Sequence, residues 1–216
     1  MKQQTIDFIK ENKIIAIVRG VDKEDIVKLG EALYEGGIRL IEVTFNQKDP
    51  NHLQITGDII KTLSEEMAGK ICVGAGTVMN EAQCMAAYNA GAKYFISPNT
   101  NFDVIKKANE LDVVSIPGSL TPTEAAAAYD AGADFVKLFP AGNLGTGYIK
   151  SVCAPLNHID FLAVGGINAK NAQDFIDVGV CGVGVGGNLV DVKVIKAGEF
   201  DKITAAAKEY IENLRG

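Results

Sequence analysis

Short apolar runs alternate with longer amphipathic segments along almost the whole chain. The runs are four to six residues long, rich in Val, Ile, Leu and Phe, and often bounded by Gly, Asn or Pro, which is typical of strands buried on both faces of a parallel sheet. Eight runs fit this description: residues 14–19, 40–45, 71–75, 94–97, 113–116, 135–139, 161–164 and 182–186. The alternation therefore predicts eight strands, most of them followed by a helix.

The intervening segments carry helix start and stop signals. Three helices are expected to follow a capping Asp or Asn and to end before a glycine: residues 23–35 after Asp22, 81–89 after Asn80 and 169–178 after Asn168. Thr121-Pro122-Thr123-Glu124 has the form of a capping box with proline at the first helical position. With a further helix expected over residues 1–13, the pattern predicts a single-domain (β/α)8 TIM barrel over residues 1–216. A doubly wound open sheet is the alternative.

Two charged residues, Lys137 and Glu42, interrupt buried runs. Each lies five residues after a glycine, Gly132 and Gly37, in an even-numbered strand, so a barrel would place both side chains in one interior layer. A buried ammonium group is costly unless it is paired, has a lowered pKa or performs chemistry. A desolvated lysine is also the residue that forms Schiff bases with carbonyl substrates. A structural ion pair, or a lysine reaching water from the strand end, would be the non-catalytic explanation.

Further candidates follow the strands, at the end of the barrel where active sites of this fold lie. Arg19 would clamp a carboxylate or phosphate, Thr77 would hydrogen-bond a ligand, and Phe139 would form a wall, although a rim arginine and a core phenylalanine are the structural alternatives. Pro98 follows the fourth strand. Glycine-rich turns after the last two strands predict a phosphate site made by Gly165, Gly166, Gly186, Gly187 and Asn188.

Composition narrows the function classes. The net charge of -6 argues against a nucleic-acid partner, and no apolar stretch reaches the ~18 residues of a membrane span. The four cysteines show no C-x-x-C spacing, which is typical of reduced thiols in a cytoplasmic protein. His52 and His158 form no metal-binding motif, so no metal is expected.

Together these segments resemble the 2-keto-3-deoxy-6-phosphogluconate aldolase / 4-hydroxy-2-oxoglutarate aldolase family, along nearly the whole chain. The most specific matches are Ile41-Glu42-Val43-Thr44, Gly74-Ala75-Gly76-Thr77-Val78, Ile96-Ser97-Pro98 and Lys137-Leu138-Phe139-Pro140-Ala141. The resemblance implies a cytoplasmic, homotrimeric, metal-independent class I aldolase without a cofactor. In such an enzyme Lys137 would form a covalent imine with the substrate, Glu42 would move protons directly or through water, and Thr77 would contact the pyruvyl portion.

Two positions depart from the family pattern. Asn46 stands where an arginine commonly holds the substrate carboxylate, as in the similar phosphogalactonate aldolases, and Gly187 stands where a serine is often found. The predicted reaction is cleavage of a 2-keto-3-deoxy-6-phospho sugar acid, with the phosphogluconate form first, to pyruvate and glyceraldehyde 3-phosphate. 4-Hydroxy-2-oxoglutarate is a second expected substrate. The alternatives are a phosphogalactonate aldolase, a non-covalent phosphate-binding barrel epimerase, isomerase or decarboxylase, and a catalytically silent sugar-acid-phosphate sensor.

Overall fold

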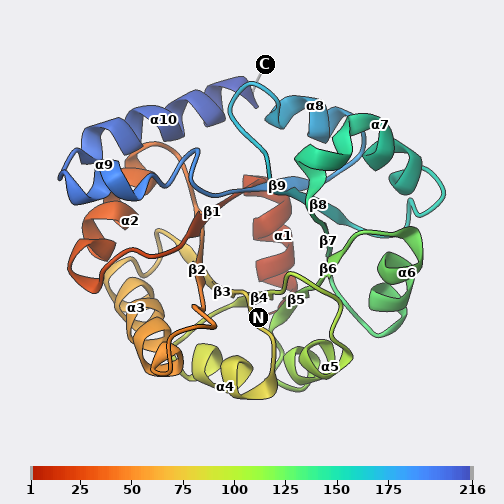
Figure 1. The fold of residues 1–216 in the computed structure, drawn as a ribbon, viewed down its shortest axis with the longest axis horizontal. Helices are drawn as coiled ribbons and strands as arrows, with labels where there is room; N and C mark the ends of the chain where they lie inside the picture. Colours follow the sequence, from red (N-terminus) through yellow and green to blue (C-terminus); the bar gives the residue numbers. More distant parts are fainter. Residues whose placement is uncertain (1, 215–216) are drawn as a thin grey trace.

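A barrel of parallel strands surrounded by helices forms the core of the computed structural model, which describes residues 2–214 (Figure 1). The strands are β1 (Ile14–Val18), β2 (Leu40–Thr44), β3 (Cys72–Gly76), β4 (Tyr94–Ile96), β5 (Val114–Ile116), β6 (Gly118–Ser119), β7 (Val136–Leu138), β8 (Phe161–Val164) and β9 (Gly182–Val185). They lie in the order β5-β4-β3-β2-β1-β9-β8-β7-β6. All the strand pairs are parallel.

The barrel closes between β5 and β7 through β6, a short strand that lies beyond the predicted fifth strand, residues 113–116. β5 and β6 are consecutive in the chain and separated by Pro117, whose nitrogen carries no proton to donate to a sheet. Phe135 N donates to Ser115 O, and Lys137 N donates to Pro117 O at 2.9 Å, so this segment still bonds to its neighbour. The prediction of a (β/α)8 barrel is confirmed, with β6 as an additional short strand after the fifth.

All the helices except α1 lie in the outer ring seen in Figure 1, and α1 lies across the middle of the barrel in that view. The helices are α1 (Lys2–Asn12), α2 (Ile26–Glu35), α3 (His52–Glu66), α4 (Glu81–Asn89), α5 (Phe102–Glu110), α6 (Pro122–Asp130), α7 (Ala141–Cys153), α8 (Ala172–Asp177), α9 (Val192–Lys196) and α10 (Phe200–Asn213). α10 packs on α2, and Thr204 Oγ1 donates to Ala32 O at 3.0 Å. None of the helices in the described part of the chain combines the length and hydrophobicity needed to span a membrane.

Two of the predicted helix starts are confirmed in detail. Asn80 Oδ1 accepts from Gln83 N at the start of α4, and Thr121 and Glu124 form both bonds of the predicted capping box at the start of α6. Glu124 Oε2 accepts from Thr121 N at 2.8 Å, which completes the box.

The other two starts are corrected. Asp22 makes no capping bond, and the chain first forms a 3-10 turn, Lys23–Asp25, before α2 begins at Ile26. Asn168 Oδ1 accepts from Lys170 N and Asn171 N, which closes a local turn and delays α8 to Ala172.

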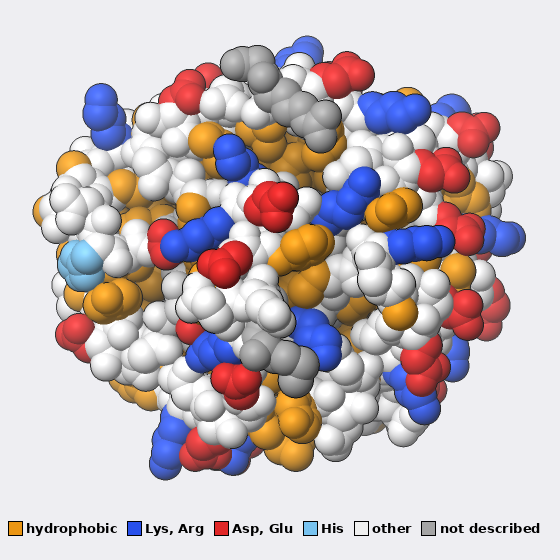
Figure 2. Space-filling model, turned by 180° about the vertical axis from the view of Figure 1, so that it is seen from behind, with side chains coloured by type: hydrophobic (Ala, Val, Ile, Leu, Met, Phe, Trp, Pro, Cys, Tyr) orange, Lys and Arg blue, Asp and Glu red, His pale blue; other side chains and the backbone are white. Residues whose placement is uncertain are grey.

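α1 covers the N-terminal end of the barrel. Lys2 forms an ion pair with Asp134, shortly before β7, and Lys10 forms one with Asp160, immediately before β8. Ile9 is fully buried and packs with the apolar interior of the barrel. Seen from behind in Figure 2, basic and acidic side chains are interspersed over the surface with apolar patches between them. The barrel interior is therefore filled at this end, which leaves the opposite end for a site.

Candidate active site

A cavity of about 310 Å³ lies at the C-terminal ends of the strands. It is lined by Ile17, Arg19, Glu42, Thr77, Pro98, Lys137, Phe139, Val164, Gly165, Gly166, Ile167, Gly184, Gly186, Gly187 and Asn188. The structure thus brings together every candidate residue named from the sequence except Asn46.

Asn46 is exposed and does not line this cavity. Its Oδ1 accepts from Lys48 N at 3.2 Å, so the short side chain closes a turn after β2. The role of Asn46 as a carboxylate-binding residue stays a prediction.

Lys137 lies in the middle of β7, between Gly118 of β6 and Leu162 of β8. Its side chain faces the barrel interior and the residue is 7% exposed, so it is not a surface lysine at a strand end. Burial lowers the pKa of Lys137 below its ordinary value, although the nearby Glu42 carboxylate opposes this shift. Its Nζ lies 4.8 Å from the centre of the Phe139 ring, which forms one wall of the cavity. Burial thus shifts the Lys137 amine toward its neutral, nucleophilic form.

Glu42 lies on β2 opposite Ile17 and Gly74, and is 2% exposed. Burial raises the pKa of Glu42, while Lys137 and Arg19 oppose the shift. Its Oε2 has no hydrogen-bond partner. Of the ion pairs among the described residues, none joins Glu42 to Lys137. The geometry does not support the structural ion pair, and leaves both groups available to a ligand.

Strand β3 makes room for Glu42, a feature that the sequence reasoning missed. A Cβ on Gly76 would lie 1.5 Å from Glu42 Oε1, and one on Gly74 would overlap the ring of Tyr94. Tyr94 is fully buried, and its hydroxyl has no partner. The signal was present in the sequence as glycines at alternate positions, 74 and 76, which share one face of the strand.

The mouth of the cavity carries a cation and several open backbone segments. Arg19 Nη2 donates to Thr77 Oγ1 at 3.4 Å, a long bond that a ligand could replace. A Cβ added at Gly186 or Gly187 would meet no atom within 4 Å. Asn188 Nδ2 donates to Ile167 O at 2.8 Å, which ties the two late turns together. These turns leave space in which backbone N–H groups can approach an anion.

Metal chemistry has no group of side chains here to support it. Within residues 2–214, the structure places no three His, Cys, Asp or Glu side chains where they would hold a metal ion.

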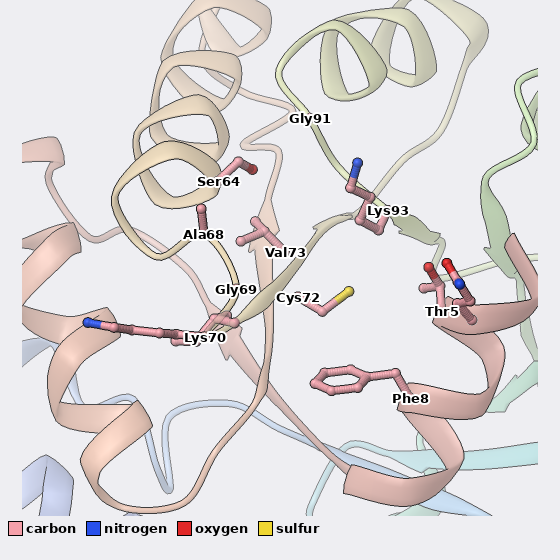
Figure 3. Close-up of a pocket in the computed structure, with 12 residues that line it drawn as sticks. Thr5, Phe8, Ser64, Ala68, Gly69, Lys70, Cys72, Val73, Gly91 and Lys93 are labelled. Carbon is pink, nitrogen blue, oxygen red and sulfur yellow. The ribbon is translucent and has the colours of Figure 1, made fainter. Parts of the chain in front are cut away.

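A second hollow, of about 460 Å³, lies at the other end of the barrel between α1, α3 and β3 (Figure 3). Phe8, Cys72 and Val73 give it an apolar floor, and the Lys70 amino group extends away from them toward the Tyr34 ring, 5.8 Å from its centre. Burial raises the pKa of the Cys72 thiol to about 11, so it stays protonated near neutral pH. This hollow is larger, but the cavity around Lys137 is the one that combines a buried lysine with a buried carboxyl group and an arginine.

Comparisons with known proteins agree with this geometry. The family model described as KDPG and KHG aldolase matches residues 5–206. The chain is 36% identical over 180 residues to a probable 2-dehydro-3-deoxy-6-phosphogalactonate aldolase of Rhizobium meliloti, covering 83% of this chain and 82% of the relative. It is 33% identical over 218 residues to the KHG/KDPG aldolase of Escherichia coli, covering 99% and 98%.

A solved structure of a KDPG aldolase from Legionella pneumophila, with pyruvate captured as a covalent carbinolamine, superimposes with a TM-score of 0.85 at 27% identity. That match covers 96% of this chain and 98% of the other. From the family model and the full-length relatives, the chain belongs to the KDPG and KHG aldolase family.

Proposed function

We propose that this protein is a class I aldolase in which Lys137 forms a Schiff base. Its substrate would be a 2-keto-3-deoxy-6-phospho sugar acid, with the phosphogluconate form first, cleaved to pyruvate and glyceraldehyde 3-phosphate. The observation that carries the proposal is a buried Lys137, which forms no ion pair with Glu42, in the same cavity as a buried Glu42 whose Oε2 has no hydrogen-bond partner. The covalent pyruvate adduct named for the Legionella relative is consistent with this chemistry.

The reaction begins when neutral Lys137 Nζ attacks the C2 ketone to give a carbinolamine. Protonation of the carbinolamine hydroxyl by Glu42 lets water leave, which gives an iminium ion and a Glu42 carboxylate. Glu42 then takes the proton of the C4 hydroxyl as the C3–C4 bond breaks. The bonding electrons move into the iminium group, which gives an enamine on Lys137 and releases the aldehyde. Glu42 returns the proton to C3, and hydrolysis of the imine releases pyruvate. A raised pKa suits Glu42 to this exchange, because the carboxyl must both accept and return a proton.

The two ends of the substrate would meet different parts of the cavity. Arg19 and Thr77, which both line the cavity, would bind the carboxylate end, and a phosphate would occupy the open space beside Gly186 and Gly187. The galactonate-derived acid is the second candidate, because Asn46 replaces the arginine of the family pattern and one relative bears that name. 4-Hydroxy-2-oxoglutarate would be an additional, unphosphorylated substrate.

The test is incubation with pyruvate and borohydride, followed by intact-mass measurement and peptide mapping, with Lys137→Ala as the matched control. We expect a pyruvyl adduct on Lys137 in the wild type and none in the variant. A folded wild-type protein without an adduct would favour the non-covalent barrel enzymes, or the sensor if ligands only raise its Tm. Cleavage rates with the gluconate and galactonate acids then decide between the two substrates.

We also propose the homotrimer that the family resemblance implies. Met85, Tyr88 and Phe102 expose apolar side chains on α4 and α5, and burial in an assembly would remove them from water. Light scattering on the purified protein tests this state, with three times the monomer mass as the expected result and the monomer mass as the contrary one.

A further inference from the structure

Thr77 enters the cavity in a strained backbone conformation. It follows β3 directly and has a φ of 55°, which is unusual for a β-branched residue. Such conformations persist where the surrounding structure imposes them, and they concentrate at functional sites. The hydrogen bonds around this turn therefore show what holds the Thr77 hydroxyl toward Arg19.

Most of these bonds come from β4 and the residues after it. Val78 N donates to Ile96 O at 3.1 Å, Ser97 Oγ donates to Val78 O at 2.6 Å, and Asn101 Nδ2 donates to Met79 O at 3.0 Å. The Thr77 carbonyl is held from the opposite side, by the loop after β2. Gln47 Nε2 donates to Thr77 O at 2.8 Å.

Gln47 is itself oriented by a buried neighbour on α4. Gln83 is fully buried, and its Oε1 accepts from Met79 N at 2.6 Å, so its Nε2 must point the other way. That Nε2 lies 2.9 Å from Gln47 Oε1 and 3.2 Å from His52 Nδ1. With its oxygen engaged by Gln83, the Gln47 amide can present only its nitrogen to Thr77. The donors thus run in one direction, from Gln83 through Gln47 to Thr77.

We propose that Gln47 is a positioning residue that holds Thr77 in its left-handed conformation, so that the Thr77 hydroxyl faces Arg19 and the carboxylate end of the substrate. The proposal rests on the aldolase function proposed above. Gln47 does not line the cavity and acts only through the Thr77 peptide. It contributes to binding the keto acid and has no part in breaking the C3–C4 bond.

The variant Gln47→Glu tests this, because it keeps the side-chain length and the oxygen that accepts from Gln83 but opposes an oxygen to Thr77 O. A lost bond of this kind corresponds to about a tenfold change. We therefore expect KM for the keto acid to rise about tenfold, with kcat changed less than about twofold and Tm lowered by no more than about 4 °C. Gln54→Glu, on the exposed face of α3, makes the same change of charge and should retain the wild-type KM.

A double-mutant cycle gives the second readout. If Gln47 acts through Thr77, Gln47→Ala should add less than about twofold to the loss in kcat/KM that Thr77→Ala causes alone. Additive losses, or a wild-type KM in folded Gln47→Glu, would overturn the proposal while leaving the aldolase function intact.

Failure of the function is separable from failure of this inference. A wild-type protein that forms no pyruvyl adduct removes the aldolase proposal. The crystal structure of Gln47→Glu then decides the inference on its own: a Thr77 that leaves positive φ supports it, and one that keeps positive φ refutes it.

Discussion

Gly76→Ala offers a direct test of Glu42 without changing any charged group. The added Cβ would lie 1.5 Å from Glu42 Oε1, whereas an ordinary contact between such atoms is roughly 3.4 Å or more. The carboxylate oxygen must therefore move by roughly 2 Å, since the neighbouring strand backbone is fixed by the sheet. Displacements of about 1 Å can cost about 10²-fold in rate, and the loss of a general acid/base group costs about 10²–10⁴-fold.

We expect kcat for cleavage to fall by about 10²–10⁴-fold, and overpacking to lower the free energy of unfolding by about 1–3 kcal/mol. Lys137 is not displaced, so borohydride should still trap pyruvate on it. Steady-state kinetics, urea unfolding and mass spectrometry measure the three quantities. Gly147→Ala is the matched control, because it makes the same change at an exposed position of α7 with no atom within 4 Å of the new Cβ. Wild-type kcat in folded Gly76→Ala would refute the assignment of proton transfer to Glu42.

Three further changes have defined outcomes. Lys137→Met should abolish the pyruvyl adduct and flatten the pH dependence of the free energy of unfolding. Burial lowers the pKa of Lys137 below 10.5 in the folded protein, so the unfolded chain binds more protons and wild-type stability rises as the pH approaches 10.5. Urea unfolding at several pH values measures this slope. Glu42→Gln should slow turnover by about 10²–10⁴-fold. It should also remove the loss of stability as pH rises above 4.5, because burial raises the native pKa; an unchanged slope would contradict this. Thr121→Ala should cost about 0.5–2 kcal/mol of stability with kcat/KM unchanged, and Thr123→Ala, which removes no cap, should cost less.

The barrel was predictable because its strands are buried on both faces and its turns are short. Apolar runs and glycine boundaries located the strands to within one or two residues, and equal spacing from Gly37 and Gly132 put Glu42 and Lys137 in one cavity. The short strand β6 beyond Pro117 was missed, because a proline between apolar residues reads as the end of a strand. Here the chain continues to bond on the other side.

Side-chain competition explains most of what the sequence could not predict. Asn and Asp are residue types that often bind ligands or cap helices. In this protein, however, Asn46 and Asn168 accept hydrogen bonds from nearby backbone N–H groups, and the Asp22 side chain makes no capping bond. Periodicity cannot tell these uses apart. The link from Gln83 to Gln47 joins α4 to the loop after β2, and no local pattern marks a contact across 36 positions.

The closure of the barrel floor by α1 has a kinetic consequence. Because Ile9 and the interior cluster fill that end, both products of the proposed cleavage must leave by the mouth through which the substrate entered. In the proposed mechanism the aldehyde is free once the carbon–carbon bond breaks, while the three-carbon fragment is still bound covalently to Lys137. Product release is therefore ordered, with the aldehyde leaving first and pyruvate last. Pyruvate should accordingly compete with substrate for the same empty enzyme, and the aldehyde should not.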